Sequence, residues 1–373
     1  MNSMNISILG SSITTFGELW NSSLNDLLIS VAKESLADAN LEEKNIEAVF
    51  VGNKAAGNFE NQHHLNALVS QLFSHYPPAM RVEAACASGS LALLTAEYAL
   101  LAGQYETVMV IGAEKMTDVS ADETTHILSG AASTETEVGS TFPALYGMLA
   151  QQHMLKYGTT REQLSAVAVK NHKHALSNPH AQYHTTFTLD QVSKSTLIAD
   201  PIRILDCSPI SDGASAIILT TKKAVGKPKI IGFGHAQDSI DLASRSSLTS
   251  LYATTQASKQ ALQQSGLAIK DISVAEVHDC FTIAEILAIE DLGFFEKGQG
   301  GVATLEGKTT EGGNVVINPS GGLKACGHPV GATGVKQVAF LSKRLEAGND
   351  AYALTHNVGG SGATAVVHIV SKK

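Results

Sequence analysis

Short apolar runs alternate along this chain with longer segments in which apolar positions recur at helical spacing. This alternation predicts an α/β fold with largely buried sheets. In the first half we predict helices at residues 24–40 and 89–102, the second with an apolar stripe formed by Leu91, Leu94, Tyr98 and Leu101. The predicted strands of this half are residues 6–9, 48–51, 81–83, 108–112 and 215–220.

A second series of strands and helices starts near Lys227 and follows a similar order. We predict its strands at residues 229–232, 273–277, 351–355 and 364–369, and its helices at residues 254–265, at residues 283–292 and after Gly334. In each half a reactive-looking residue follows a strand and opens a helix. This residue is Cys86 in the first half and belongs to His278-Asp-Cys-Phe281 in the second. The shared order indicates an internal structural repeat.

The stretch between the two halves has a different composition. Residues 117–203 are rich in Thr, Ser, His and Gln and lose the strand pattern, although helices are predicted at residues 149–157 and 161–176. We therefore interpret this stretch as an inserted lobe. The predicted division is an N-terminal half made of residues 1–117 and 204–225, an inserted loop lobe at 118–203, and a C-terminal half at 226–373.

Composition and charge exclude several classes of protein. A chain of 373 residues exceeds the size at which a single core usually divides. The net charge of −9, with no long basic run, argues against binding to nucleic acid or anionic membranes. No stretch approaches the ~18 apolar residues of a membrane span, and the first six residues do not start a signal peptide. We therefore expect a cytoplasmic protein.

The four cysteines, Cys86, Cys207, Cys280 and Cys326, are too few for a disulfide scaffold and lack the paired spacing of a zinc site. Cys86 stands out because it precedes a predicted buried helix and has small neighbours on both sides. The helix dipole and unpaired N–H groups at that end favour the thiolate, which is the nucleophilic form. The alternative is a small buried residue that only packs.

Three other segments carry candidate chemistry. The first, His278-Asp-Cys-Phe281, holds an imidazole and a thiol at a strand end, and the second, residues 318–334, is a glycine-rich loop around His328. The third is the glycine-rich turn that starts at His356. Glycine clusters often serve only turns with positive φ, but they also let backbone N–H groups approach a ligand.

Together these segments resemble the thiolase superfamily over nearly the whole chain. The stretch around Cys86 is similar to the nucleophile segment of that family, and Gly327-His-Pro-Val-Gly-Ala-Thr-Gly334 is similar to its Gly-His-Pro block. His278-Asp-Cys-Phe281 and His356-Asn stand where most thiolases carry Asn-Glu-Ala-Phe and Cys-x-Gly. These two differences resemble the sterol-carrier-protein-2 type of thiolase.

The resemblance implies a layered α-β-α-β-α fold, a homodimer or homotetramer, and a role in fatty acid or lipid metabolism. It also implies reversible cleavage or Claisen condensation of 3-oxoacyl-CoA through an acyl-Cys86 intermediate, with coenzyme A as a substrate and no metal or redox cofactor. His328 would take the thiol proton directly or would stabilise an existing thiolate. Cys280 would move the α-carbon proton in place of the usual cysteine, whose position holds His356.

The resemblance suggests two sites for the oxyanions. His278 and His328 could form one hole, and the N–H of Cys86 with that of Gly359 or Gly360 could form the other. His356 is retained as a further catalytic candidate. We expect the remaining cysteines and histidines to be packing or surface residues: Cys207, Cys326, His63, His64, His172, His174, His180 and His184.

Three rival functions share this pattern. A ketoacyl-synthase-like condensing enzyme uses a similar cysteine and histidine layout, but it needs no second thiol. A retro-aldolase would keep the fold and cleave a different bond. A non-catalytic acyl-CoA-binding subunit is the third rival, although Cys86, Cys280 and His328 are all present.

Overall fold

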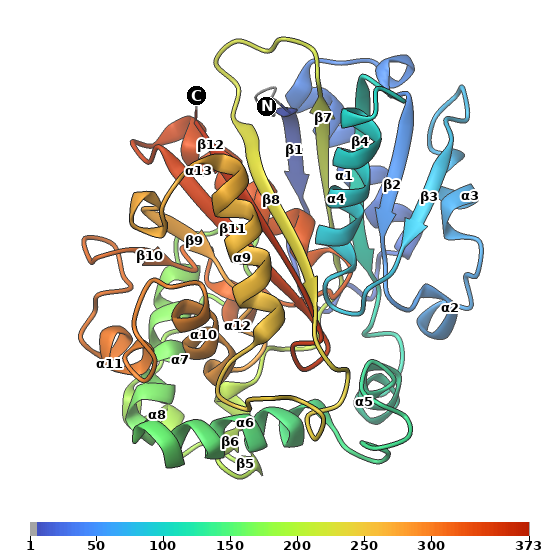
Figure 1. Cartoon of the computed structure of the whole chain (residues 1–373). Helices are drawn as coiled ribbons and strands as arrows, with labels where there is room; N and C mark the ends of the chain where they lie inside the picture. Colours follow the sequence, from blue (N-terminus) through green and yellow to red (C-terminus); the bar gives the residue numbers. More distant parts are fainter. Residues whose placement is uncertain (1–5, 373) are drawn as a thin grey trace.

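The computed structural model describes residues 6–372, so the N-terminal segment inspected for a signal peptide lies mostly outside the described residues. One large sheet runs through the molecule in the order β10-β9-β11-β12-β8-β1-β7-β4-β2-β3 (Figure 1). Its first-half strands are β1 Ile6–Ile13, β2 Ala48–Gly52, β3 Ala79–Val82, β4 Thr107–Glu114 and β7 Gly213–Thr220. Its second-half strands are β8 Lys229–Gln237, β9 Val274–Glu276, β10 Val316–Ile317, β11 Tyr352–Gly359 and β12 Thr364–Ser371.

The two halves repeat one topology. The orders β3-β2-β4-β7-β1 and β10-β9-β11-β12-β8 match strand for strand, and both contain two parallel pairs followed by two antiparallel pairs. The half-sheets join at a short seam between β1 and β8, where Ile6 pairs with Ile230 and Ser7 with Lys229. This confirms the predicted internal repeat.

The repeat relates different loops from those that the sequence suggested. Cys86 follows β3, so its counterpart is the loop after β10 that carries His328. The block at His278 follows β9 and corresponds to the segment at Asn53, which follows β2. Our pairing of Cys86 with His278 was therefore wrong, and the duplicated loops bring Cys86 and His328 to equivalent places.

Helices cover both outer faces and fill the centre, which confirms the predicted layers. The central helices are α4 Ser88–Leu101 and α13 Thr333–Ala347, and one apolar core joins residues of both helices to strands of both half-sheets. On the outer faces, α1 Leu24–Ala39 and α3 Leu65–Ser70 pack on the first half-sheet, and α9 Tyr252–Ser265 and α10 Thr282–Asp291 on the second.

The buried face of α4 differs from the predicted stripe. Leu94 is buried, but Tyr98 is 54% exposed and Leu101 is 47% exposed. The side chains that reach the core are instead Leu93, Leu94 and Leu100, together with Ala92 and Ala96. Small alanines allow this central helix to pack closely on several sides, so its apolar positions follow no single stripe.

The segment that we predicted to be an inserted loop lobe, residues 118–203, is mostly helical, and we keep the name lobe for it. It contains α5 Ala121–Ser129, α6 Phe142–Tyr157, α7 Arg161–Ala175, α8 Leu189–Ser193, and the small pair β5 Leu197–Ala199 and β6 Ile202–Arg203. Three further short α-helices lie outside this segment: α2 Ala56–Phe59, α11 Gly300–Leu305 and α12 Gly322–Cys326. Within the described residues, no helix combines the length and apolar character needed to cross a membrane.

Candidate active site

Cys86 lies in the turn between β3 and the central helix α4. The preceding residue, Ala85, has a φ of 52°, in the left-handed region that a side chain rarely adopts. The turn is held by Ser88, whose Oγ accepts a hydrogen bond from Ala84 N at 2.9 Å and donates to Ala85 O at 2.6 Å. A strained turn held in this way presents the half-buried thiol to a cavity.

Glycines allow the two central helices to meet directly behind this turn. A Cβ on Gly89, in the first turn of α4, would lie 2.6 Å from the carbonyl oxygen of Gly331, just before α13. A side chain at this position would therefore push the helix starts apart. The glycine-rich loop around His328 therefore permits close packing of the two helices, and it also contributes residues to the cavity wall.

The thiol of Cys86 has a higher pKa than the sequence led us to expect. Burial raises the pKa of Cys86 to about 11, although the charge of Lys54 and a backbone hydrogen bond from Gly360 act in the opposite direction. Desolvation of the thiolate therefore outweighs the field of the helix start. Of the two states that the sequence left open for Cys86, the raised pKa favours the protonated thiol, which needs a base within reach to become a nucleophile.

Two histidines stand next to Cys86. The rings of His278 and His328 lie with their centroids 5.1 Å apart at an interplanar angle of 82°. One nitrogen of each ring and the Cys86 Sγ all lie within 4.8 Å of one another. Burial lowers the pKa of His328 to about 3 and that of His278 well below its usual range, so both rings are neutral near pH 7. The structure thus brings together three of the residues that the sequence singled out.

Hydrogen bonds at Nδ1 give the two neutral rings opposite roles. The amide of Asn357 faces Nδ1 of His278 at 3.1 Å, so this nitrogen accepts and the proton sits on Nε2. Thr333 Oγ1 donates to Pro329 O, so it accepts from Nδ1 of His328 at 2.7 Å. In the described part of the chain neither Nε2 atom has a hydrogen-bond partner. Nε2 of His328 is left as a base and that of His278 as a donor.

His356 is separated from this group. Its Nε2 faces Thr254 Oγ1 at 2.9 Å, and its Nδ1 accepts from the backbone N–H of His278. The ring is fully buried and does not line the cavity. The next residue, Asn357, points to the opposite side of β11 and bonds both His278 and the carbonyl of Cys86, at 3.1 Å each. The hydrogen bond from the His278 backbone to the His356 ring therefore helps to hold His278 in position.

Cys280 and Gly360 line the same cavity as Cys86 and His328. The cavity has a volume of about 160 Å³, and its wall is mainly apolar. Burial raises the pKa of Cys280 well above its usual range, and proximity to Cys86 acts in the same direction. The apolar part of the wall is formed by Met116, Leu128, Phe142, Tyr146, Ile210, Phe281 and Val330.

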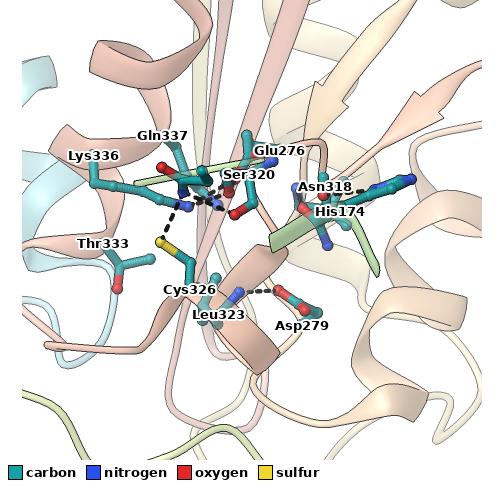
Figure 2. A network of polar contacts seen from close by, with 12 residues as sticks. His174, Glu276, Asp279, Asn318, Ser320, Leu323, Cys326, Thr333, Lys336 and Gln337 are labelled. Carbon is teal, nitrogen blue, oxygen red and sulfur yellow. Dashed lines mark hydrogen bonds and ion pairs between the residues drawn. The ribbon is translucent and has the colours of Figure 1, made fainter. Parts of the chain in front are cut away.

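A buried polar network supports the loop that carries His328 (Figure 2). Lys336 on α13 pairs with Glu276 at 3.0 Å and also contacts Ser320, which donates to Glu276 at 2.7 Å. Nearby, Asp279 accepts from the backbone N–H of Leu323 at 2.6 Å. These contacts tie the strand end before His278 to the loop before His328, and this fixes the two rings relative to each other.

The remaining cysteines and histidines divide differently from our expectation. Cys326 is fully buried and does not line the cavity, in keeping with packing. Cys207, which we expected only to pack, lies in the cavity wall. His172 is buried with its Nδ1 2.9 Å from Thr185 O, and His174 contacts Asn318 O. His63, His64 and His184 are exposed as expected, while His180 is half-buried.

Sequence reasoning did not single out Tyr146. Its side chain is only 1% exposed and it lines the cavity beside Cys280. Tyr146 lies on α6, which begins at Phe142, whereas we predicted a helix from residue 149. Pro143 at the helix start was the available signal, because proline favours the first turn of a helix. An earlier start would have placed Tyr146 on the same helix.

Comparison with known proteins identifies the family. The thiolase N-terminal domain model matches residues 6–223, and the thiolase C-terminal domain-like model matches residues 234–372. The chain belongs to the thiolase family. An acetyl-CoA acetyltransferase of Methanothermobacter thermautotrophicus is 45% identical, covering 98% of this chain and 99% of the relative. Human sterol carrier protein 2 is 33% identical, covering 91% of this chain and 66% of the relative.

Solved structures share the fold at lower identity. The human mitochondrial 3-ketoacyl-CoA thiolase superposes with a TM-score of 0.79 at 18% identity, covering 99% of this chain and 98% of the other. An Ltp2–ChsH2(DUF35) aldolase reaches a TM-score of 0.83 at 23% identity, with the same coverage. These likenesses confirm the predicted thiolase fold. At such identities they do not distinguish thiolysis from aldol cleavage.

Proposed function

We propose that this thiolase transfers acetyl groups, cleaving acetoacetyl-CoA with coenzyme A or condensing two acetyl-CoA molecules. The observation that carries the proposal is one cavity holding a thiol next to a neutral imidazole with an unpaired nitrogen, together with a second thiol. The small apolar cavity, of about 160 Å³, fits a short acyl group. The relative that is 45% identical over almost the whole chain is named for the same activity.

Acylation begins with the protonated thiol of Cys86. His328 Nε2 takes the proton as the sulfur attacks the thioester carbonyl, which avoids forming a free thiolate in the apolar cavity. The N–H at Nε2 of His278 then stabilises the oxyanion. When the carbon–sulfur bond of the thioester breaks, the sulfur of coenzyme A takes the proton of Cys280. Cys86 is now acylated, His328 is charged and Cys280 is a thiolate.

Condensation reverses these charges. The Cys280 thiolate removes a proton from the methyl group of a second acetyl-CoA, and the resulting carbanion attacks the acyl carbon on Cys86. The Cys86 sulfur leaves and recovers its proton from His328. The methyl proton replaces the one that Cys280 gave to coenzyme A, so Cys86, Cys280 and His328 all return to their starting protonation states and the cycle needs no external acid or base. Cys86 N–H and a glycine N–H of the turn at Gly359 and Gly360 are the proposed second oxyanion site.

A direct assay tests the function. Acetoacetyl-CoA and free coenzyme A are mixed with the protein, and loss of the acetoacetyl-CoA enolate absorbance is followed. We expect rapid cleavage to acetyl-CoA, whereas a malonyl thioester offered as an alternative should not be decarboxylated. Decarboxylation without thiolysis would favour a ketoacyl-synthase-like condensing enzyme. Cleavage of a β-hydroxyacyl thioester without thiolysis would favour a retro-aldolase.

We also propose that the protein works as a homodimer or a dimer of dimers. The outermost strand of the first half-sheet, β3, pairs with β2 alone among the described strands. Apolar side chains stay accessible around this edge, with Met80 on β3 40% exposed and Leu101 on the adjacent α4 47% exposed. An unpaired edge with apolar neighbours is suited to burial in a symmetric interface.

Light scattering at micromolar concentration is expected to give at least twice the chain mass of 39.1 kDa. Met80→Lys places a charge at the edge strand and should shift the protein toward the monomer. Leu155→Lys is a matched control, because Leu155 is 81% exposed on α6 in the lobe. A wild-type mass of 39.1 kDa would reject the dimer.

All four cysteines lie within the described residues 6–372, and none of them forms a disulfide there. Free thiols are typical of a reducing compartment, which supports the proposal of a cytoplasmic location. Acyl-CoA and coenzyme A are the proposed partners in the reaction, and fatty acid or lipid metabolism is its proposed setting.

A further inference from the structure

Tyr146 joins three segments of the active site from outside them. It belongs to α6 in the inserted lobe, and its ring stacks on Phe281 with centroids 4.7 Å apart and an interplanar angle of 29°. Its hydroxyl donates to the carbonyl oxygen of Gly360 at 3.2 Å. Tyr146 also lines the same cavity as Cys280, where its hydroxyl lowers the pKa of that thiol. The mechanism above gives this buried hydroxyl no role.

The hydroxyl of Tyr146 can bond both Gly360 and Cys280 only while Cys280 is protonated. A phenol has one hydrogen to donate and accepts through its oxygen. With a thiol at Cys280, the S–H donates to the oxygen of Tyr146, and the O–H of Tyr146 donates to Gly360. A thiolate has no hydrogen to donate, so the hydroxyl must turn toward the sulfur to keep that contact. The phenol therefore has two arrangements, one for each protonation state of Cys280.

The residues around Tyr146 explain why this rotation of the hydroxyl affects the Cys280 thiolate. Burial and the nearby Cys86 both raise the pKa of Cys280, while the hydrogen bond from Tyr146 acts against them. The carbonyl that the hydroxyl leaves sits in a fixed turn, because Arg245 donates to the next carbonyl, that of Ser361, at 2.7 Å. Gly360 also contributes the backbone hydrogen bond to Cys86. Its neighbours therefore include both reactive sulfurs and Tyr146.

We propose that Tyr146 is a positioning residue for Cys280, donating a hydrogen bond to the Cys280 thiolate while that sulfur exchanges a proton with the α-carbon of acetyl-CoA. This inference rests on the proposed thiolase function. The proton itself passes only between the α-carbon and the Cys280 sulfur. The hydroxyl keeps its own proton throughout and only changes its acceptor.

The test separates the two half-reactions. Tyr146→Phe removes only the hydroxyl and keeps the ring that stacks on Phe281. Acylation of Cys86 by p-nitrophenyl thioacetate, followed by mass spectrometry, should stay within about twofold of the wild-type rate, because this leaving group departs as a thiolate without the proton of Cys280. Exchange of the acetyl-CoA methyl protons with deuterated water should slow by about tenfold or more, because a hydrogen bond to a charged sulfur is lost.

Tyr157→Phe is the matched control, since Tyr157 ends the same helix and its ring packs near His153 outside the cavity. It should leave both rates unchanged, and both variants should unfold at temperatures close to that of the wild type. Unchanged exchange in Tyr146→Phe would overturn the inference. Equal slowing of acylation and exchange would also overturn it, because it would indicate a general packing role.

The Cys280→Ala variant distinguishes failure of the proposed thiolase mechanism from failure of the inference about Tyr146. If Cys280→Ala still exchanges the methyl protons, the proton carrier is another residue and the proposed function of Cys280 is wrong. If Cys280→Ala stops exchange while Tyr146→Phe does not, only the role of Tyr146 is rejected.

Discussion

Replacing Cys86 with alanine is expected to reduce thiolysis of acetoacetyl-CoA by about 10³-fold or more, equivalent to about 4 kcal/mol of transition-state stabilisation. Cys86 is the thiol that combines access to the cavity with a neighbouring basic nitrogen, that of His328. Without this sulfur no acyl-enzyme forms. The remaining groups can bind and polarise the substrate but have no nucleophile for its carbonyl.

Mass spectrometry checks this result at the level of the residue. Wild-type protein incubated with acetyl-CoA should carry one acetyl group, and peptide mapping should place it on Cys86. The Cys86→Ala variant should carry none on Cys207, Cys280 or Cys326 and should unfold at about the wild-type temperature. Thiolysis by the variant near the wild-type rate would exclude the acyl-Cys86 mechanism.

Most of the strands and helices were predictable because they are long enough for an apolar run or a helical repeat to stand out in the sequence. The strand predicted at residues 108–112 forms the centre of β4, and the helix predicted at 161–176 ends one residue later than α7. The sequence did not predict β10, which has two residues, because two positions establish no periodicity. The polar α5 was missed for a related reason, since Thr124 is its one buried residue.

The candidate site was predictable where a segment combined reactive residues with glycines. Cys86, Cys280, His278 and His328 do meet at or beside one cavity. The assignment of His356 was less reliable because it depended on one position of a strand. Adjacent residues of β11 point to opposite sides, so His356 and Asn357 could not both face Cys86. The alternation of side chains along the predicted strand would have been enough to indicate that only one of the two residues faces Cys86.

The sign of the pKa shift at Cys86 could not be predicted from its local sequence. The helix start and the small neighbours are local features, and both favoured a thiolate. Desolvation depends on residues that fold over the thiol from far along the chain, such as Phe142 of the lobe and Val330 of the glycine-rich loop. This long-range burial also explains why His328 is neutral and available as a base.

Replacing Cys280 with alanine is expected to separate acylation from carbon–carbon bond formation. Cys280 lines the cavity beside Cys86, and the position that carries a cysteine in most thiolases holds His356 here, with its ring outside the cavity. The variant should still acetylate Cys86, although release of coenzyme A would be slower because water must supply its proton. Claisen condensation and exchange of methyl protons should fall by about 10²-fold or more, the usual contribution of a positioned general base.

Cys326→Ala is the matched control for the Cys280 variant. Cys326 lies two residues before His328, but its sulfur is buried outside the cavity and accepts a hydrogen bond from Asn178 at 3.4 Å. Both half-reactions should therefore proceed at close to wild-type rates. If the Cys326 variant lost exchange while Cys280→Ala retained it, the α-carbon proton would have to reach a sulfur behind the His328 loop. The cavity would then have to open toward Asn178, and the proposed mechanism would lose its second thiol.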